Sequence, residues 1–145
     1  MEENLKILLS SLSWSCTEEE QSKAIFQLVQ FKEKLFDCLI TESGKDKWEN
    51  CIKIISQFEY QDKVKMIPQM LFLLKDMNWP GAIESVNLML GMESEDLAPS
   101  IINALEEAVH ENDTIWIAWL KEFIVTRKLK LLLEEYSEVL KLAEW

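Results

Sequence analysis

The residues that could carry out chemistry are few, and their spacing fits no recognisable catalytic pattern. His110 is the only histidine, and with Glu107 it forms one Glu-x-x-His sequence. A di-iron helical bundle needs two such sequences on different helices, so a metal site here would require a second copy of the chain. A Ser-His-Asp or Cys-His arrangement would also have to use His110, and no nucleophile stands in a known motif. We therefore expect a solvated His110 at a helix end, no metal, no cofactor and no enzymatic activity.

Charged residues gather in short runs that could serve acid–base chemistry only inside a concave site. The acidic runs are Glu18–Glu20, Glu106–Glu107 and Glu134–Glu135, and at helical spacing they predict solvated faces or helix starts. An enzyme or small-ligand binder that uses carboxylates in a helical groove is the alternative interpretation. The one basic cluster, Arg127-Lys128-x-Lys130, lies near an expected helix junction and is too small for a nucleic-acid surface.

Composition narrows the class of protein further. The chain has 145 residues and a formal net charge of -11, which disfavours nucleic acid and anionic membrane surfaces as partners and suits a basic protein. Cys16, Cys38 and Cys51 are an odd number at wide spacing, which indicates reduced thiols in the cytoplasm. Neither a signal peptide nor a membrane-spanning run is evident. We expect a single domain over residues 1–145; the oligomeric state is left open.

Hydrophobic residues recur at helical spacing along the whole chain, and no segment reads as a strand. A capping box of Thr17 and Glu20 predicts one helix start, and Asp46 and Asp113 predict two others. Pro68 should kink a helix or begin a fresh one, and Pro99 should open another. Gly91 is expected to end a helix in the left-handed conformation. The expected helices cover residues 5–12, 17–29, 32–40, 46–55, 64–74, 82–90, 99–109, 115–125 and 129–143.

A corner between two apolar helices, Asp76-Met77-Asn78-Trp79-Pro80-Gly81-Ala82, stands near the middle of the chain. Asn78 is the expected N-cap of the second helix, and Pro80 suits an early helical position. Gly81 would let another backbone approach closely. Trp79 fills the core or contributes to a binding surface. The candidate partner-binding or structural residues are Asp76, Asn78, Trp79, Pro80 and Gly81, together with Trp14 and Trp119, the two tryptophans expected to be more exposed.

Trp48, Trp79 and Trp116 recur at similar intervals, each shortly after an expected N-cap. A repeated unit of helix, turn, Trp and helix is typical of stacked helix pairs, because each pair must bury its apolar face on its neighbours. The sequence thus predicts an all-α fold of stacked antiparallel helix pairs, a HEAT-like α-solenoid. An irregular helical bundle is the alternative.

The corner also carries a family resemblance. It follows the apolar run P-Q-M-L-F-L-L, and the segments S-L-S-W, T-E-E-E-Q-S-K-A-I, K-D-K-W-E-N-C and E-N-D-T-I-W accompany it. Over roughly residues 5–125 the chain resembles a bacterial domain family of unknown function that is related to HEAT-type helical repeats. The resemblance implies that fold and lends no activity, so no catalytic residue is carried over.

These observations together favour a non-enzymatic protein-binding module. Stacked helix pairs commonly bind partners on a concave face, and an acidic surface steers basic partners toward it. One specific form is an immunity-type inhibitor whose acidic face covers a basic toxin.

Overall fold

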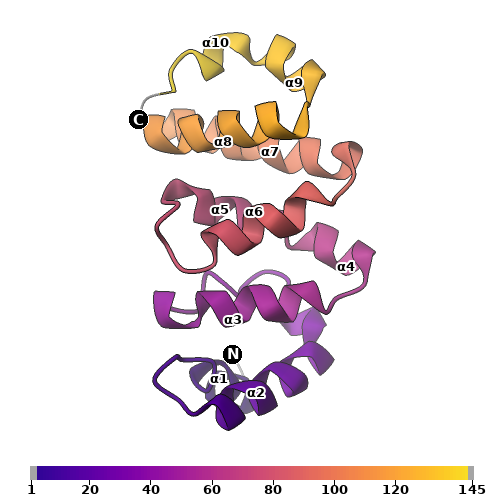
Figure 1. The fold of residues 1–145 in the computed structure, drawn as a ribbon, viewed down its shortest axis with the longest axis vertical. Helices are drawn as coiled ribbons and strands as arrows, with labels where there is room; N and C mark the ends of the chain where they lie inside the picture. Colours follow the sequence, from indigo (N-terminus) through magenta and orange to yellow (C-terminus); the bar gives the residue numbers. More distant parts are fainter. Residues whose placement is uncertain (1–2, 144–145) are drawn as a thin grey trace. The chain divides into compact units, whose positions relative to one another are not determined.

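The computed structural model describes residues 3–143, and within that range the chain forms helices and turns without a strand (Figure 1). The all-α prediction is confirmed. The elements are α1 (Glu3–Ser10), α2 (Glu18–Gln30), the 3-10 helix η1 (Lys32–Lys34), α3 (Lys45–Ser56), α4 (Tyr60–Lys65), α5 (Ile67–Phe72), the 3-10 helix η2 (Leu73–Lys75), α6 (Ala82–Leu90), α7 (Ser94–His110), α8 (Thr114–Arg127), α9 (Lys130–Glu135) and α10 (Ser137–Leu140).

The chain divides into two compact units, residues 1–69 and 70–145, with the boundary inside α5. In the N-terminal unit, α2 packs against α1 and α3 over a core that includes Leu12, Leu28 and Ile55. In the C-terminal unit, α8 lies beside α7 and also contacts η2, α9 and α10 (Figure 1). The prediction of one domain over residues 1–145 stays a prediction. No helix in the described range is long and apolar enough to cross a bilayer.

Three expected helix boundaries are confirmed. The Thr17 hydroxyl accepts from the Glu20 N–H at 3.1 Å, and the Glu20 carboxylate accepts from the Thr17 N–H at 3.2 Å, which completes the capping box of α2. The Asp113 carboxylate accepts from the Trp116 N–H at 3.0 Å at the start of α8. Pro68 is the second residue of the fresh helix α5, where a missing N–H costs no intrahelical bond.

Other boundaries were predicted wrongly. Gly44, not Asp46, is the N-cap of α3, and the Asp46 carboxylate instead lies 3.5 Å from the Lys47 ammonium. Gly91 ends α6 with φ -87°, outside the left-handed region. Pro99 lies inside α7, which begins five residues earlier at Ser94. The acidic residues after Ser94 favour that earlier start, because carboxylates in the first turn are stabilised by the helix dipole.

Two expected helices are interrupted. Residues 32–40 form only η1 and then turns, because their backbone polar groups bind side chains from elsewhere in the unit. The expected helix over residues 129–143 is divided at Tyr136 into α9 and α10. The chain bends there because α10 packs against both α8 and α9. Tertiary contacts override local periodicity in both places.

Candidate functional site

The predicted motif forms a turn that ends at Gly81. The Asp76 carboxylate accepts from the Asn78 N–H at 2.9 Å, and the Asp76 carbonyl accepts from the Trp79 N–H at 2.9 Å. Gly81 has φ 87°, a conformation that strains any residue with a Cβ, and α6 begins directly after it. Asn78 is therefore not the N-cap, and Pro80 precedes the helix. Both predictions were wrong because the left-handed Gly81 moves the helix start downstream.

An aromatic cluster surrounds Lys75 beside this turn. Its Nζ lies 4.6 Å from the Trp116 ring centroid and 5.2 Å from the Phe72 ring centroid. The same ammonium donates to the Glu111 carboxylate at 2.9 Å, and this contact holds the pKa of Glu111 below its usual range. The Trp79 ring is tilted against Phe72 with 5.6 Å between centroids.

This cluster is already filled by a side chain of the protein itself. Two aromatic faces and a carboxylate are the features that bind cationic ligands, and here they bind Lys75. The buried Trp116 indole also donates to the Leu71 carbonyl at 3.0 Å. The cluster therefore links the corner to α8 and to the end of α7, and its role is to stabilise the fold.

The candidate residues do not all come together. Trp119 is half-buried and lines a small apolar pocket of about 120 Å³ with Leu74 and Met77, so it lies beside the corner. Trp79 is also half-buried. Trp14 belongs to the N-terminal unit and is 62% exposed. The use of these residues in partner binding stays a prediction.

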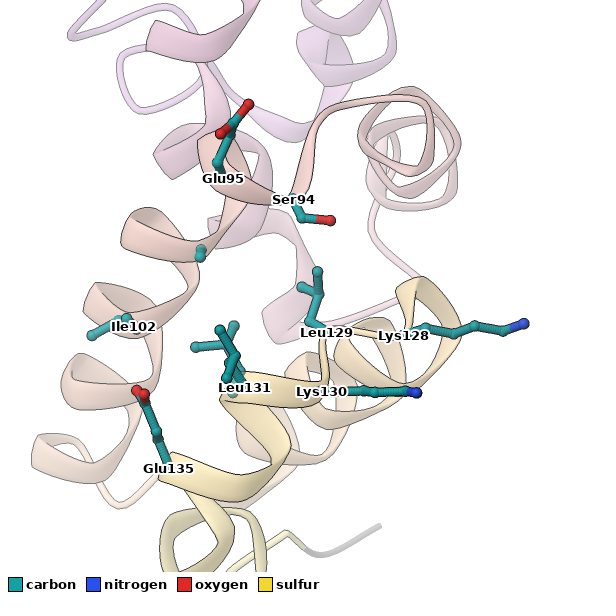
Figure 2. Close-up of a pocket in the computed structure, with 10 residues that line it drawn as sticks. Ser94, Glu95, Ile102, Lys128, Leu129, Lys130, Leu131 and Glu135 are labelled. Carbon is teal, nitrogen blue, oxygen red and sulfur yellow. The ribbon is translucent and has the colours of Figure 1, made fainter.

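A larger apolar groove, of about 460 Å³, lies in the C-terminal unit between α7 and α9 (Figure 2). We call it the α7–α9 groove, and it was not among the predicted sites. Ala98 and Ile102 of α7 form one wall, and Leu131 at its other wall is 72% exposed. The complete lining is Ser94, Glu95, Ala98, Ile102, Lys128, Leu129, Lys130, Leu131, Leu132 and Glu135. The sequence signal that could have indicated this groove is the basic cluster at 127–130, which directly precedes three consecutive leucines.

Hydrogen bonds fix both walls of the groove. Arg127 Nη2 donates to the Met92 carbonyl at 2.7 Å, which ties the end of α8 to the residues before α7. At the end of α8, Leu129 N–H donates to the Ile124 carbonyl at 3.0 Å and Lys128 N–H to the Val125 carbonyl at 3.1 Å. This pair of bonds is a Schellman motif, and it directs the chain across α8 into α9.

Most of the residues that could carry out chemistry lie apart from the groove and the corner turn, and Glu135 is the member of the acidic runs that lines the groove. His110 is exposed at the end of α7, and the acidic runs at 18–20, 106–107 and 134–135 are exposed as predicted. Burial raises the pKa of the Cys51 thiol to about 12, which keeps it protonated and unreactive at neutral pH. Across residues 3–143 no cluster of three or more His, Cys, Asp or Glu side chains could hold a metal ion.

Over residues 3–143 the protein is all-helical, and its C-terminal unit carries an apolar groove. Residues 39–143 match the family model described as Domain of unknown function (DUF5071), and the chain belongs to that family. The expected membership in a family of unknown function is thereby confirmed, although the match begins and ends later than the residues 5–125 that we expected. No curated protein and no solved structure matches the chain.

Proposed function

We propose that this protein is a non-enzymatic protein-binding module whose α7–α9 groove receives a segment of its partner. The proposal rests on this groove, which has a volume of about 460 Å³ and a mainly apolar lining. One of its lining residues, Leu131, is 72% exposed. Exposing such a side chain costs free energy in water, and contiguous exposed apolar surface is typical of interaction sites.

The charge of the molecule supports a basic partner, as in an immunity-type inhibitor of a basic toxin. The chain has 26 acidic and 15 basic residues. Several of the basic groups are engaged internally, among them Lys32 with Asp62 and Lys75 with Glu111. Each such pair also occupies one carboxylate, so the net charge of -11 is unchanged, and it would accelerate encounter with a positively charged protein at low salt.

A HEAT-like arrangement of stacked helix pairs remains part of the proposal. α7 and α8 are joined by three residues and pack together, as expected for one antiparallel pair. Trp48 and Trp116 add a repeated feature, since each is buried near a helix start and its indole N–H donates to a backbone carbonyl. We also propose a bacterial, cytoplasmic protein, a location that suits the free thiols of Cys16, Cys38 and Cys51.

A small-ligand binder is the second candidate, because the groove volume falls within the usual range for ligand pockets. A thermal-shift screen with metals, nucleotides and common metabolites separates the two functions. A ligand that binds only the folded state must raise the melting temperature. A flat screen would count against this candidate and against an enzyme that uses carboxylates.

The protein-binding proposal is tested by affinity capture from lysate of the source cell with the full chain as bait, at low and moderate salt. We expect the wild-type chain to capture one basic protein in stoichiometric amount. The Leu131→Asp variant should capture at least about ten-fold less of it. Phe26→Asp is the matched control, since Phe26 is 69% exposed in the other unit, and it should capture normally. Equal recovery by wild type and Leu131→Asp would contradict the proposal.

A further inference from the structure

α7 and α8 end in the same backbone motif, but with different residues at its left-handed position. After α7, Asp113 N–H donates to the Ala108 carbonyl and Asn112 N–H to the Val109 carbonyl, and Asn112 has φ 55°. After α8, Lys128 takes the left-handed position with φ 59°. Glycine is usual there and asparagine is tolerated, whereas lysine is strained. Backbone strain at an exposed residue such as Lys128 suggests that its side chain has a functional role.

Lys128 lies on the rim of the α7–α9 groove. Figure 2 shows its side chain extending next to that of Lys130 on one side, while Glu135 reaches toward Ile102 on the opposite side. Glu95, in the first turn of α7, also lines the groove on that side. Within residues 3–143 none of these four charged groups forms an ion pair. The groove therefore has an apolar floor between a basic rim and an acidic rim.

We propose that the groove binds one amphipathic helix of the partner protein, with acidic residues along the flank facing Lys128 and Lys130 and basic residues along the flank facing Glu95 and Glu135. This inference rests on the proposed protein-binding function and names the chemistry of the bound segment. The partner stays basic overall, but the segment that docks carries both signs of charge.

The dimensions and the fold favour a helix as the occupant. The lining residues of α7 run from Ser94 to Ile102, which corresponds to about 12 Å of helix, or roughly two turns of an apposed one. A stripe of apolar side chains at i, i+3, i+4 and i+7 would fill a floor of that length. A peptide bound as a β-strand would need a sheet edge to pair with, and the described chain contains no strand. A polyproline segment would need an aromatic-lined groove, and the lining of this groove contains no aromatic residue.

Three synthetic helical peptides test the charge pattern. They share one apolar stripe and differ in their flanks: one acidic and one basic flank, two basic flanks, or two acidic flanks. Binding to the full-length protein is measured by fluorescence anisotropy at low salt. We expect the peptide with split flanks to bind tightest, by about five-fold over either of the others. In the Lys128→Glu, Lys130→Glu double variant, the peptide with two basic flanks should become the tightest.

Lys128→Gly separates the use of the side chain from its structural cost. We expect this variant to melt at a higher temperature than wild type and yet to bind the split-flank peptide about two- to five-fold more weakly. Asn112→Gly is the matched control, because it changes the same backbone position of the same motif away from the groove. It should leave peptide affinity unchanged.

The outcomes distinguish failure of this inference from failure of the proposed function. Equal affinity for the three peptides, or no binding by any of them, would overturn the inference, while a capture that depends on Leu131 would still support the groove as a binding site. A concentration-dependent dimer that Leu131→Asp dissolves would also overturn it, since the occupant would then be a second copy. Capture insensitive to Leu131→Asp would remove both proposals.

Discussion

Two irregular segments, residues 35–44 in the N-terminal unit and 76–81 in the C-terminal unit, are held in place by different means. In the first, the buried Gln69 amide accepts from the Ile40 N–H at 2.7 Å and donates to the Phe36 carbonyl at 2.6 Å. The Trp48 indole donates to the carbonyls of Ile40 and Ser43, both at 3.0 Å. Side chains from α5 and α3 thus replace the helical hydrogen bonds that this segment lacks.

In the second segment, local chemistry makes the turn. Asp76 bonds to residues two and three positions later, and Gly81 supplies a positive φ. Beyond these bonds, the Trp79 ring packs against Phe72, and Met77 lines a small apolar pocket with Trp119. The difference teaches that a loop closed by buried polar side chains depends on single remote residues, whereas a turn closed by its own residues distributes that dependence.

The largest effect is expected from removing the buried amide. Gln69→Leu leaves the Ile40 N–H and the Phe36 carbonyl without their partner, which should lower the free energy of unfolding by about 3 kcal/mol. Urea denaturation measures this loss. Gln61→Leu, at an exposed position of α4, is the control and should stay near wild type. Equal stability of the two variants would mean that Gln69 does not hold the segment.

The two buried indoles compare the units directly. Trp48→Phe removes the donor to two carbonyls and should cost about 2 kcal/mol, whereas Trp116→Phe removes the donor to one and should cost about 1.5 kcal/mol. Both are measured by chemical denaturation followed by circular dichroism. A larger loss for Trp116→Phe would show that its contact with Lys75 outweighs the extra hydrogen bond in the N-terminal unit.

Gly81→Ala tests whether the second segment depends on its left-handed residue. A Cβ at φ 87° is strained, so we expect the free energy of unfolding to fall by about 1 kcal/mol. Gly91→Ala is the control: its φ is -87°, and an added Cβ would meet only the Leu88 carbonyl oxygen at 3.8 Å. Thermal melts measure the difference. An equal fall in the melting temperature of both variants would contradict the role of the positive φ.

The smallest effect concerns the ion pair of the N-terminal unit. Lys32 Nζ lies 2.6 Å from the Asp62 carboxylate and holds the pKa of Asp62 below its usual range. The stabilisation is therefore complete above about pH 4 and is lost as the pH falls through the lowered pKa. Asp62→Asn should be less stable than wild type at pH 7, with a gap that narrows in acid. Asp37→Asn, at an exposed position of the same unit, is the control and should stay near wild type in stability at pH 7.

The sequence could predict those features that depend on neighbouring residues. The Thr17–Glu20 capping box, the Asp113 cap and the fresh helix at Pro68 each involve groups within a few positions of one another. Asn78 was assigned as a cap by the same reasoning, but the later Gly81 competes for the helix start and prevails. The α7–α9 groove could not be predicted, because Ile102 and Leu131 are adjacent only after α8 has packed on α7 and α9.

The sequence alone determined the all-α class, the acidic charge and the local caps, because helical periodicity, side-chain ionisation and capping are set by residue type and short spacing. Tertiary structure alone decided that residues 35–44 are not helical and that residues 130–140 form two helices. It also decided that Lys128 stands strained on the rim of an apolar groove. For the two interrupted helices, contacts from other elements override the local preference for helix, and no local pattern in the sequence records such contacts.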